Sequence, residues 1–236
     1  MSSFLERLAA IKASKLSLKD KLATLRTEYE SKWAQPYELE AIHRSIDELI
    51  RSDAAARALK AGDLAPGFGL IDNEGNLVCS RQLLVRGPLI VVFYRGVWCP
   101  YCNLDLQALE DARSEIEWRG AHLIAISQQT EDFSRKAQQT NSLGFPILSD
   151  PGGKVSELFG IRWTVPEPLR ESHRLANAEL PQFNGDQTWT LPMPARFLVG
   201  RDGIIAYAEV NPDYTKRPEP SEMFPVLDAL RHHVGT

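Results

Sequence analysis

The spacing of hydrophobic residues changes about a quarter of the way along the chain. Before that point, apolar side chains recur with the period of an amphipathic helix over residues 16–29 and again over 39–50. Pro36 separates these stretches, and a capped short helix is expected at 52–59. The pattern predicts an N-terminal helical extension over residues 1–60. It leaves open whether the apolar stripe faces the rest of the chain or a second copy.

The remaining pattern is that of buried strands alternating with helices. Apolar runs at 89–94 and 121–127 have the length and β-branched content of strands covered on both faces. A helical pattern between them, to about Trp118, makes a strand-helix-strand unit with parallel strands. The order predicts an α/β domain over residues 61–236, with a central mixed sheet flanked by helices. Further expected elements are two short strands at 65–78, helices at 80–84, 130–140 and 153–159, a strand at 145–148, a hairpin at 191–208 and a closing helix at 218–233.

One stretch, at 163–190, interrupts this pattern. It contains several prolines and two tryptophans among polar residues. It is too polar for a core segment, so we expect an irregular insert that forms a lid or wall over the functional site.

Composition and charge narrow the functional class. The 236 residues are 43% hydrophobic and 25% charged, with a net charge of −4. This composition is typical of a globular protein, and it gives no electrostatic reason to expect nucleic acid or an anionic membrane as partner. Neither a secretory signal nor a long apolar run is found, so a cytoplasmic location is expected and a membrane span is not.

The candidate chemistry lies where the strand at 89–94 gives way to a helix. Pro100 suits the first helical turn, so Cys99 is expected at the N-cap. The unpaired N–H groups and dipole of a helix start stabilise a thiolate, and Arg95 adds positive charge nearby. Cys102 lies one turn later on the same side of the helix. The two sulfurs are therefore expected to close a disulfide that resolves an adduct on Cys99.

The Cys-x-x-Cys pair also admits other interpretations. A tetrahedral zinc site needs two more Cys or His ligands, for which the terminal His232-His233 pair is a poor substitute, so no metal is expected. A thiol-disulfide oxidoreductase of the thioredoxin or glutaredoxin type uses the same motif and stays open as the alternative function. Cys79 lies in a surface-like turn and is expected to take no part in the redox chemistry. It stays open whether Cys79 resolves an oxidised cysteine from a distance.

Four motifs taken together resemble one known family. They look like the peroxiredoxin-like branch of the alkyl hydroperoxide reductase/thiol-specific antioxidant (AhpC/TSA) family, many members of which carry a similar helical extension. The motifs are Gly62-Asp63-x-Ala65-Pro66-x-Phe68-x-Leu70, Phe93-Tyr94-Arg95-Gly96-x-Trp98-Cys99-Pro100-Tyr101-Cys102, Ala125-Ile126-Ser127-x-Gln129-Thr130 and Phe145-Pro146-Ile147-Leu148-Ser149-Asp150.

The resemblance implies a thioredoxin-like, peroxiredoxin-type fold and reduction of hydrogen peroxide or organic hydroperoxides by a cysteine thiolate. In the implied cycle, Cys99 becomes a sulfenic acid and Cys102 condenses with it to a disulfide. An external thiol, such as thioredoxin or the glutaredoxin/glutathione system, then regenerates the pair. The resemblance implies no cofactor, and a homodimer stays open.

The sequence departs from the family at two positions. Typical members have a Thr-x-x pattern before the attacking cysteine, which would align Cys99 with the threonine and Cys102 with the attacking cysteine, so the order of attack stays open. The position of the family's usual active-site arginine is occupied here by Pro194, where thioredoxin-like proteins keep a cis-proline. Arg95 or Arg196 is expected to take the role of that arginine. The expected site residues are Cys99 and Cys102 for catalysis, with Arg95, Gly96, Trp98, Pro100, Pro194 and Arg196 in support.

Overall fold

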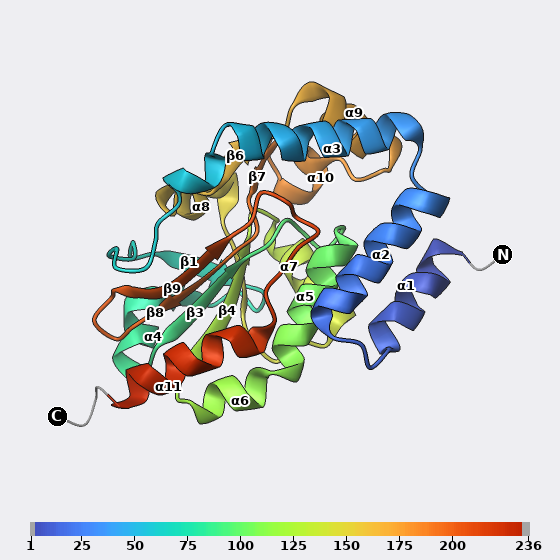
Figure 1. The fold of residues 1–236 in the computed structure, drawn as a ribbon. Helices are drawn as coiled ribbons and strands as arrows, with labels where there is room; N and C mark the ends of the chain where they lie inside the picture. The colour runs from blue at the N-terminus through green and yellow to red at the C-terminus, as the bar shows by residue number, and fades with distance from the viewer. Residues whose placement is uncertain (1–2, 233–236) are drawn as a thin grey trace.

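The computed structural model describes residues 3–232. Seven of the nine strands in this range form one mixed sheet, with helices packed against it (Figure 1). The strands are β1 (Gly69–Asp72), β2 (Leu77–Cys79), β3 (Leu89–Phe93), β4 (His122–Ser127), β5 (Ile147–Ser149), β6 (Arg162–Thr164), β7 (Thr190–Pro192), β8 (Ala195–Val199) and β9 (Ile205–Val210). The helices are α1 (Phe4–Ala13), α2 (Leu18–Lys32), α3 (Pro36–Arg51), α4 (Ser80–Arg86), α5 (Pro100–Asp111), α6 (Arg113–Trp118), α7 (Glu131–Asn141), α8 (Lys154–Leu158), α9 (Glu167–Leu175), α10 (Leu180–Asn184) and α11 (Phe224–His232). Short 3₁₀ helices lie at Ala54–Arg57, Pro151–Gly153 and Pro220–Met223.

The strand order of the main sheet is β2-β1-β5-β4-β3-β8-β9. The three central neighbours β5, β4 and β3 are parallel, while β1, β2, β8 and β9 pair antiparallel. Strands β6 and β7 form a separate antiparallel pair. This arrangement confirms the predicted α/β class with a central mixed sheet.

Strand β3 is buried on both faces and divides the core into two layers. Its side chains alternate, so Val92 belongs to the layer that contains α5, whereas Val91 and Phe93 belong to the opposite layer. All three are 1% exposed. Because β3 is held from both sides, the residues that follow it start from a fixed place in the middle of the sheet.

The N-terminal helices pack on the core of the main domain. Leu18, Leu22 and Leu25 of α2 are buried in the same cluster as Leu106 and Leu109 of α5. Helix α3 lies beside α9 on another side of the molecule (Figure 1). The apolar stripe of α2 therefore faces this chain, and a domain boundary near residue 60 stays a prediction.

The extension contains one more helix than predicted. Helix α1 ends at Ala13, and Ser17 caps α2 by accepting a hydrogen bond from the Asp20 N–H at 3.1 Å. Serine favours a cap over a helix interior because its hydroxyl competes for backbone groups. The short third helix is a single 3₁₀ segment at Ala54–Arg57.

The prediction of an irregular segment at 163–190 is wrong. Helices α9 and α10 lie there, between β6 and β7. Pro168 and Pro181 occupy the first turns of these helices, where the missing N–H would be unpaired in any case. The prolines that suggested an irregular chain therefore start helices.

Two other helices differ from the predicted pattern by more than one or two terminal residues. The helix after the cysteines breaks at Ala112, so α5 and α6 replace one helix to Trp118. The closing helix begins as a 3₁₀ segment, and His233 lies outside the described residues. Within residues 3–232, none of the helices has the length and apolar character needed to cross a membrane.

Gly160 marks a close contact between the extension and the main domain. Its φ is +72°, and a β-carbon there would lie 2.2 Å from the Arg57 carbonyl oxygen. Gly152 has nearly the same φ, +70°, with no atom within 4 Å of a β-carbon. We expect Gly152→Ala to lower the free energy of unfolding by about 1 kcal/mol, and Gly160→Ala to lower it by about 2–4 kcal/mol because the clash adds to the backbone strain. Urea denaturation measures both, and equal losses would contradict the contact.

Candidate active site

Cys99 and Cys102 lie where β3 gives way to α5. Cys99 is the N-cap of α5 and Pro100 occupies the first turn, both as predicted. The two cysteines are buried, at 1% and 0% exposed, and both are free thiols. The Cys-x-x-Cys spacing places the two thiols within one helical turn, where Cys102 helps to lower the pKa of Cys99.

Arg95 is the residue that contacts both cysteines. Its Nη1 lies 3.8 Å from the Cys99 Sγ, and its backbone N–H donates to the Cys102 Sγ at 3.5 Å. The guanidinium lies against the rings of Trp98 and Tyr214, with its Cζ 4.8 Å and 3.8 Å from their centroids. These cation–π contacts hold the charge beside the sulfurs without neutralising it.

The acidities of the two thiols differ. Burial by itself raises the pKa of Cys99, but the hydrogen bond from Cys102 and the charges of Arg95 and Arg217 outweigh burial and lower that pKa to about 6. Burial and the neighbouring Cys99 raise the pKa of Cys102 well above its usual range. Near neutral pH the pair therefore holds one negative charge, on Cys99.

A buried carboxylate holds two further guanidiniums behind the cysteines. Asp105 of α5 pairs with Arg196 of β8 and with the Nε of Arg217, the latter at 3.3 Å, and all three side chains are at most 2% exposed. Arg217 Nη2 lies 3.6 Å from the Cys102 Sγ. Of the two arginines expected to replace the family's usual one, Arg95 reaches the sulfurs, whereas Arg196 contacts Asp105.

The sequence pattern alone does not identify Asp105 or Arg217. Asp105 lies three residues after Cys102 on the apolar face of α5, and a carboxylate on such a face is a signal for a buried ion pair. Arg217 lies 115 residues after Cys102, in a loop where no local pattern distinguishes it from a solvated arginine.

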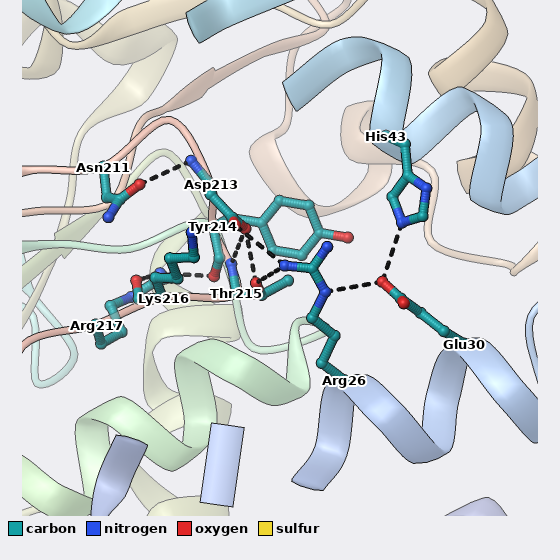
Figure 2. A network of polar contacts seen from close by, with 9 residues as sticks. All are labelled: Arg26, Glu30, His43, Asn211, Asp213, Tyr214, Thr215, Lys216 and Arg217. Atoms are coloured by element: carbon teal, nitrogen blue, oxygen red, sulfur yellow. Dashed lines mark hydrogen bonds and ion pairs between the residues drawn. The ribbon is translucent and has the colours of Figure 1, made fainter. Parts of the chain in front are cut away.

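The loop that carries Arg217 is anchored by the N-terminal extension. Figure 2 shows Arg26 of α2 reaching this loop, with Nη1 3.1 Å from Asp213 and 3.2 Å from Thr215. Asp213 also accepts the Thr215 backbone N–H at 3.1 Å, which closes a tight turn around Tyr214. Helix α2 thus fixes the turn that brings an aromatic ring and a guanidinium to the cysteines.

Gly96 and Trp98 shape the turn before the cysteines. A β-carbon on Gly96 would lie 2.3 Å from the Trp98 Nε1, so the indole packs where any side chain would be. The Gln129 amide accepts the Val97 backbone N–H at 2.8 Å and donates to the Tyr94 hydroxyl at 3.1 Å. The turn is therefore tied to the chain that follows β4.

Pro194 lies beside the site in the trans form. The peptide bonds described by the structure include no cis bond, so Pro194 departs from the cis form that thioredoxin-like proteins keep at this position. Pro194 lines one small cavity together with Arg95 and Tyr214.

A cavity of about 320 Å³ opens onto Cys99. The stretch at 163–190 forms one wall through α9, as predicted, and the N-terminal extension forms another, which the sequence did not predict. Cys102 does not line it. The lining residues are Phe4, Tyr29, Glu38, Ile42, Arg95, Trp98, Cys99, Pro100, Tyr101, Leu169, Ser172, His173, Ala176, Ala178 and Tyr214.

His173 contributes an uncharged ring to this cavity. Burial and the nearby charge of Arg95 lower the pKa of His173 to about 3. Its Nδ1 lies 3.1 Å from the Ala178 carbonyl oxygen, and its ring packs edge-on to Trp98 at a centroid distance of 4.9 Å. The ring therefore adds to the apolar wall and is a poor proton acceptor at neutral pH.

Cys79 lies apart from the cysteine pair. It ends β2, at the edge of the sheet, and three strands separate β2 from β3. This distance favours the passive role. Within residues 3–232, no group of three or more Cys, His, Asp or Glu side chains is arranged to hold a metal ion.

The sequence is similar to those of known peroxiredoxins and of a thiol-disulfide oxidoreductase. The sequence model of the AhpC/TSA family matches residues 61–208. Peroxiredoxin Bcp of Escherichia coli strain K12 is 35% identical over 104 residues, which span 44% of this chain and 65% of that protein. The thiol-disulfide oxidoreductase ResA of Halalkalibacterium halodurans is 29% identical over 104 residues, 44% of this chain and 58% of that protein.

The fold is similar to the crystal structure of peroxidoxin BcpB from Mycobacterium tuberculosis. The TM-score is 0.57 at 20% identity, and the match covers 75% of this chain and 99% of that one. This likeness confirms the predicted thioredoxin-like fold of the peroxiredoxin type.

The charge of Arg217 is expected to contribute to the acidity of Cys99. Thiolate absorbance followed against pH should give a midpoint near 6 for the native protein. Arg217→Met should move the midpoint upward because one of the lowering charges is gone. Arg44→Met is the matched control, since Arg44 is exposed on α3 and pairs with Glu48. An unchanged midpoint in Arg217→Met would contradict the arrangement.

Stability is expected to rise with pH between about pH 6 and pH 8. In this window Cys99 is a thiolate in the folded state and a protonated thiol, of pKa about 8.5, in the unfolded state. The unfolded state therefore binds more protons, and raising the pH favours folding. Chemical denaturation across this range should show a steeper rise for the native protein than for Cys99→Ser. Parallel curves would contradict the lowered pKa.

Proposed function

Because the chain belongs to the AhpC/TSA family, we propose that it is a thiol peroxidase, which reduces hydrogen peroxide or organic hydroperoxides with Cys99 and Cys102. The observation that carries the proposal is a buried Cys99 that faces a cavity, touches Arg95 and has a pKa lowered to about 6. A thiolate present at neutral pH is the nucleophile that this reaction requires.

In the first proposed step, the Cys99 thiolate attacks the distal oxygen of the hydroperoxide. An S–O bond forms, the O–O bond breaks, and the electron pair leaves on an alkoxide or hydroxide that takes a proton from solvent. The guanidinium of Arg95, 3.8 Å from the Cys99 sulfur, is placed to stabilise charge on the leaving oxygen. The products are a sulfenic acid on Cys99 and an alcohol or water.

In the second proposed step, Cys102 attacks the Cys99 sulfenic acid. The new S–S bond expels water, and the thiol pair has then supplied both electrons that reduced the peroxide. The spacing of Cys99 and Cys102 at the start of α5 places both thiols within one helical turn, which supports closure of the disulfide. Arg217, 3.6 Å from the Cys102 sulfur, favours the thiolate that Cys102 must form in order to attack.

Cys99 is the proposed attacking cysteine, although alignment with typical family members places Cys102 in that role. Cys99 lines the cavity and Cys102 does not. The pKa of Cys102 is raised by burial and by its neighbour, which keeps its sulfur protonated and less nucleophilic in the resting pair.

The cavity walls support a substrate with an apolar body. Ile42 and Leu169, together with several aromatic rings, surround the approach to Cys99. Such walls accommodate an alkyl or aryl group by the hydrophobic effect, so organic hydroperoxides are part of the proposal alongside hydrogen peroxide.

The proposal includes an external thiol that returns the disulfide to the dithiol. Thioredoxin, or the glutaredoxin/glutathione system, is the proposed donor of two electrons. A cytoplasmic location fits such a supply because that compartment keeps thiols reduced. A homodimer also belongs to the proposal.

A second candidate function is thiol-disulfide exchange on protein substrates. The similarity to the thiol-disulfide oxidoreductase ResA favours it, as does the Cys-Pro-Tyr-Cys sequence. Burial of Cys99 under the extension opposes it, because a protein disulfide must reach the attacking sulfur.

Rapid mixing with hydrogen peroxide and with cumene hydroperoxide tests the proposal, with tryptophan fluorescence as the signal. At pH 7 the thiolate fraction of Cys99 is about 30-fold that of free cysteine, given pKa values of about 6 and 8.5. We expect a larger ratio because Arg95 stabilises the leaving oxygen. Oxidation no faster than free cysteine, together with rapid reduction of protein disulfides, would favour the second candidate function.

Two cysteine variants separate the roles within the pair. Cys102→Ser should keep the fast oxidation and accumulate a sulfenic acid that a dimedone-type reagent traps on Cys99, whereas Cys99→Ser should lose the fast phase. Cys79→Ser serves as the matched control and should behave like the native protein. A fast phase that survives in Cys99→Ser would assign the attack to Cys102.

A further inference from the structure

A second pocket, of about 440 Å³, lies at the opposite end of β3 from the cysteines. It is lined by the segments that precede β3 and β4, by the turn between β8 and β9, and by α11. Figure 1 shows α4, α6 and α11 gathered at this end of the sheet, away from α3 and α9. The pocket is therefore separate from the cavity that opens onto Cys99.

Arginines from four different elements converge on this pocket. Arg86 ends α4, Arg119 follows α6, Arg201 lies in the turn after β8, and Arg231 lies on α11. Asp202 is the one acidic residue in the lining, and its Oδ1 accepts the backbone N–H of a neighbouring turn residue at 3.0 Å. The chain as a whole is acidic, so this concentration of positive charge is local.

Three of the four guanidiniums have no carboxylate partner among residues 3–232. The exception is Arg119, which pairs with Asp228 at 3.0 Å and with a glutamate of α6. The salt bridges of the described residues include none for Arg86, Arg201 or Arg231. Arg201 is instead held by the Val85 carbonyl oxygen at 3.1 Å.

Trp118 orients the side chains at the rim of this pocket. It is 65% exposed, which is unusual for a large aromatic residue. The Cζ of Arg231 lies 4.5 Å from its ring centroid, and that of Arg119 lies 5.3 Å away. Stacking on the ring fixes a guanidinium while its in-plane N–H donors stay available for an anion.

Part of the pocket lining is backbone without side chains. Gly87, Gly120 and Gly200 all line it. The first two backbones touch, since a β-carbon on Gly87 would lie 2.1 Å from the Gly120 carbonyl oxygen. This contact draws the ends of α4 and α6 together, and a β-carbon on Gly120 would meet no atom within 4 Å, so the pocket is open beside that glycine.

We propose that this pocket binds a small anion that carries two or more phosphate groups. Guanidiniums present paired N–H donors that match phosphate oxygens, and three from separate elements that have no carboxylate partner within residues 3–232 suit a ligand with several negative charges. The pocket has the volume of a small-molecule site, and its concave shape favours a compact anion over an extended polymer.

Calorimetric titration of the full chain with inorganic pyrophosphate tests this proposal at constant ionic strength. Saturable binding to the native protein is expected, with an affinity at least about tenfold lower in the double variant Arg86→Gln/Arg231→Gln, because charge-assisted hydrogen bonds are lost. Arg44→Gln/Arg51→Gln removes the same charge from the exposed face of α3 and should bind like the native protein.

Three results would overturn the proposal. The first is no saturable binding of pyrophosphate by the native protein, and the second is an equal loss of affinity in the two double variants. The third is binding of heparin without binding of pyrophosphate, which would indicate a polyanion surface instead. Thiolate absorbance of Cys99 in both double variants should match that of the native protein, which shows that they are folded.

Discussion

A negative charge held out of contact with water is the constraint on which the rest of this structure depends. Cys99 and Cys102 have almost no exposed surface, yet near neutral pH the pair carries a thiolate. Such a charge persists in a protein interior only where positive groups and donors surround it. Arg95 and Arg217 are those groups, and because they are buried as well, each needs its own partners. Aromatic rings hold the first, and Asp105 holds the second.

These partners extend from the sulfurs across most of the fold. The carboxylate that holds Arg217 also pairs with Arg196 in β8, while burial raises the pKa of Glu209, which faces the same guanidiniums from β9. From the outside, Arg26 of α2 fixes the loop that ends in Arg217, as Figure 2 shows. Buried charges at low dielectric stabilise one another. Removal of one charged side chain therefore leaves its partners buried without a compensating charge. The acidity of Cys99 is therefore a joint property of the sheet, the C-terminal loop and the extension.

Local rules explain which parts of this arrangement could be predicted from the sequence. A β-branched run followed by Cys-Pro-x-Cys specifies a buried strand and an N-capped helix without reference to the rest of the chain, and so the placement of Cys99 and Pro100 was predictable. Pairing across long sequence distances is not encoded locally, which is why Arg217 was missed. The same limit applied to the cavity, because periodicity gives a helix an apolar stripe but does not say what it faces. The wrong prediction of an irregular segment at 163–190 has another cause. In the sequence alone, a proline in the first turn of a helix cannot be distinguished from a proline that ends a helix.

The separation between the cysteines and Arg217 also bears on how the protein is made. Synthesis runs from the N-terminus, so Cys99 and Cys102 leave the ribosome well before Arg217, 115 residues further on, has been added. Until the C-terminal loop docks against α2, one of the charges that lowers the pKa of Cys99 is missing. The unfinished chain thus carries a less acidic and less reactive thiol than the finished one. Cys99 therefore reaches its full acidity only when the C-terminal loop has been made and docked.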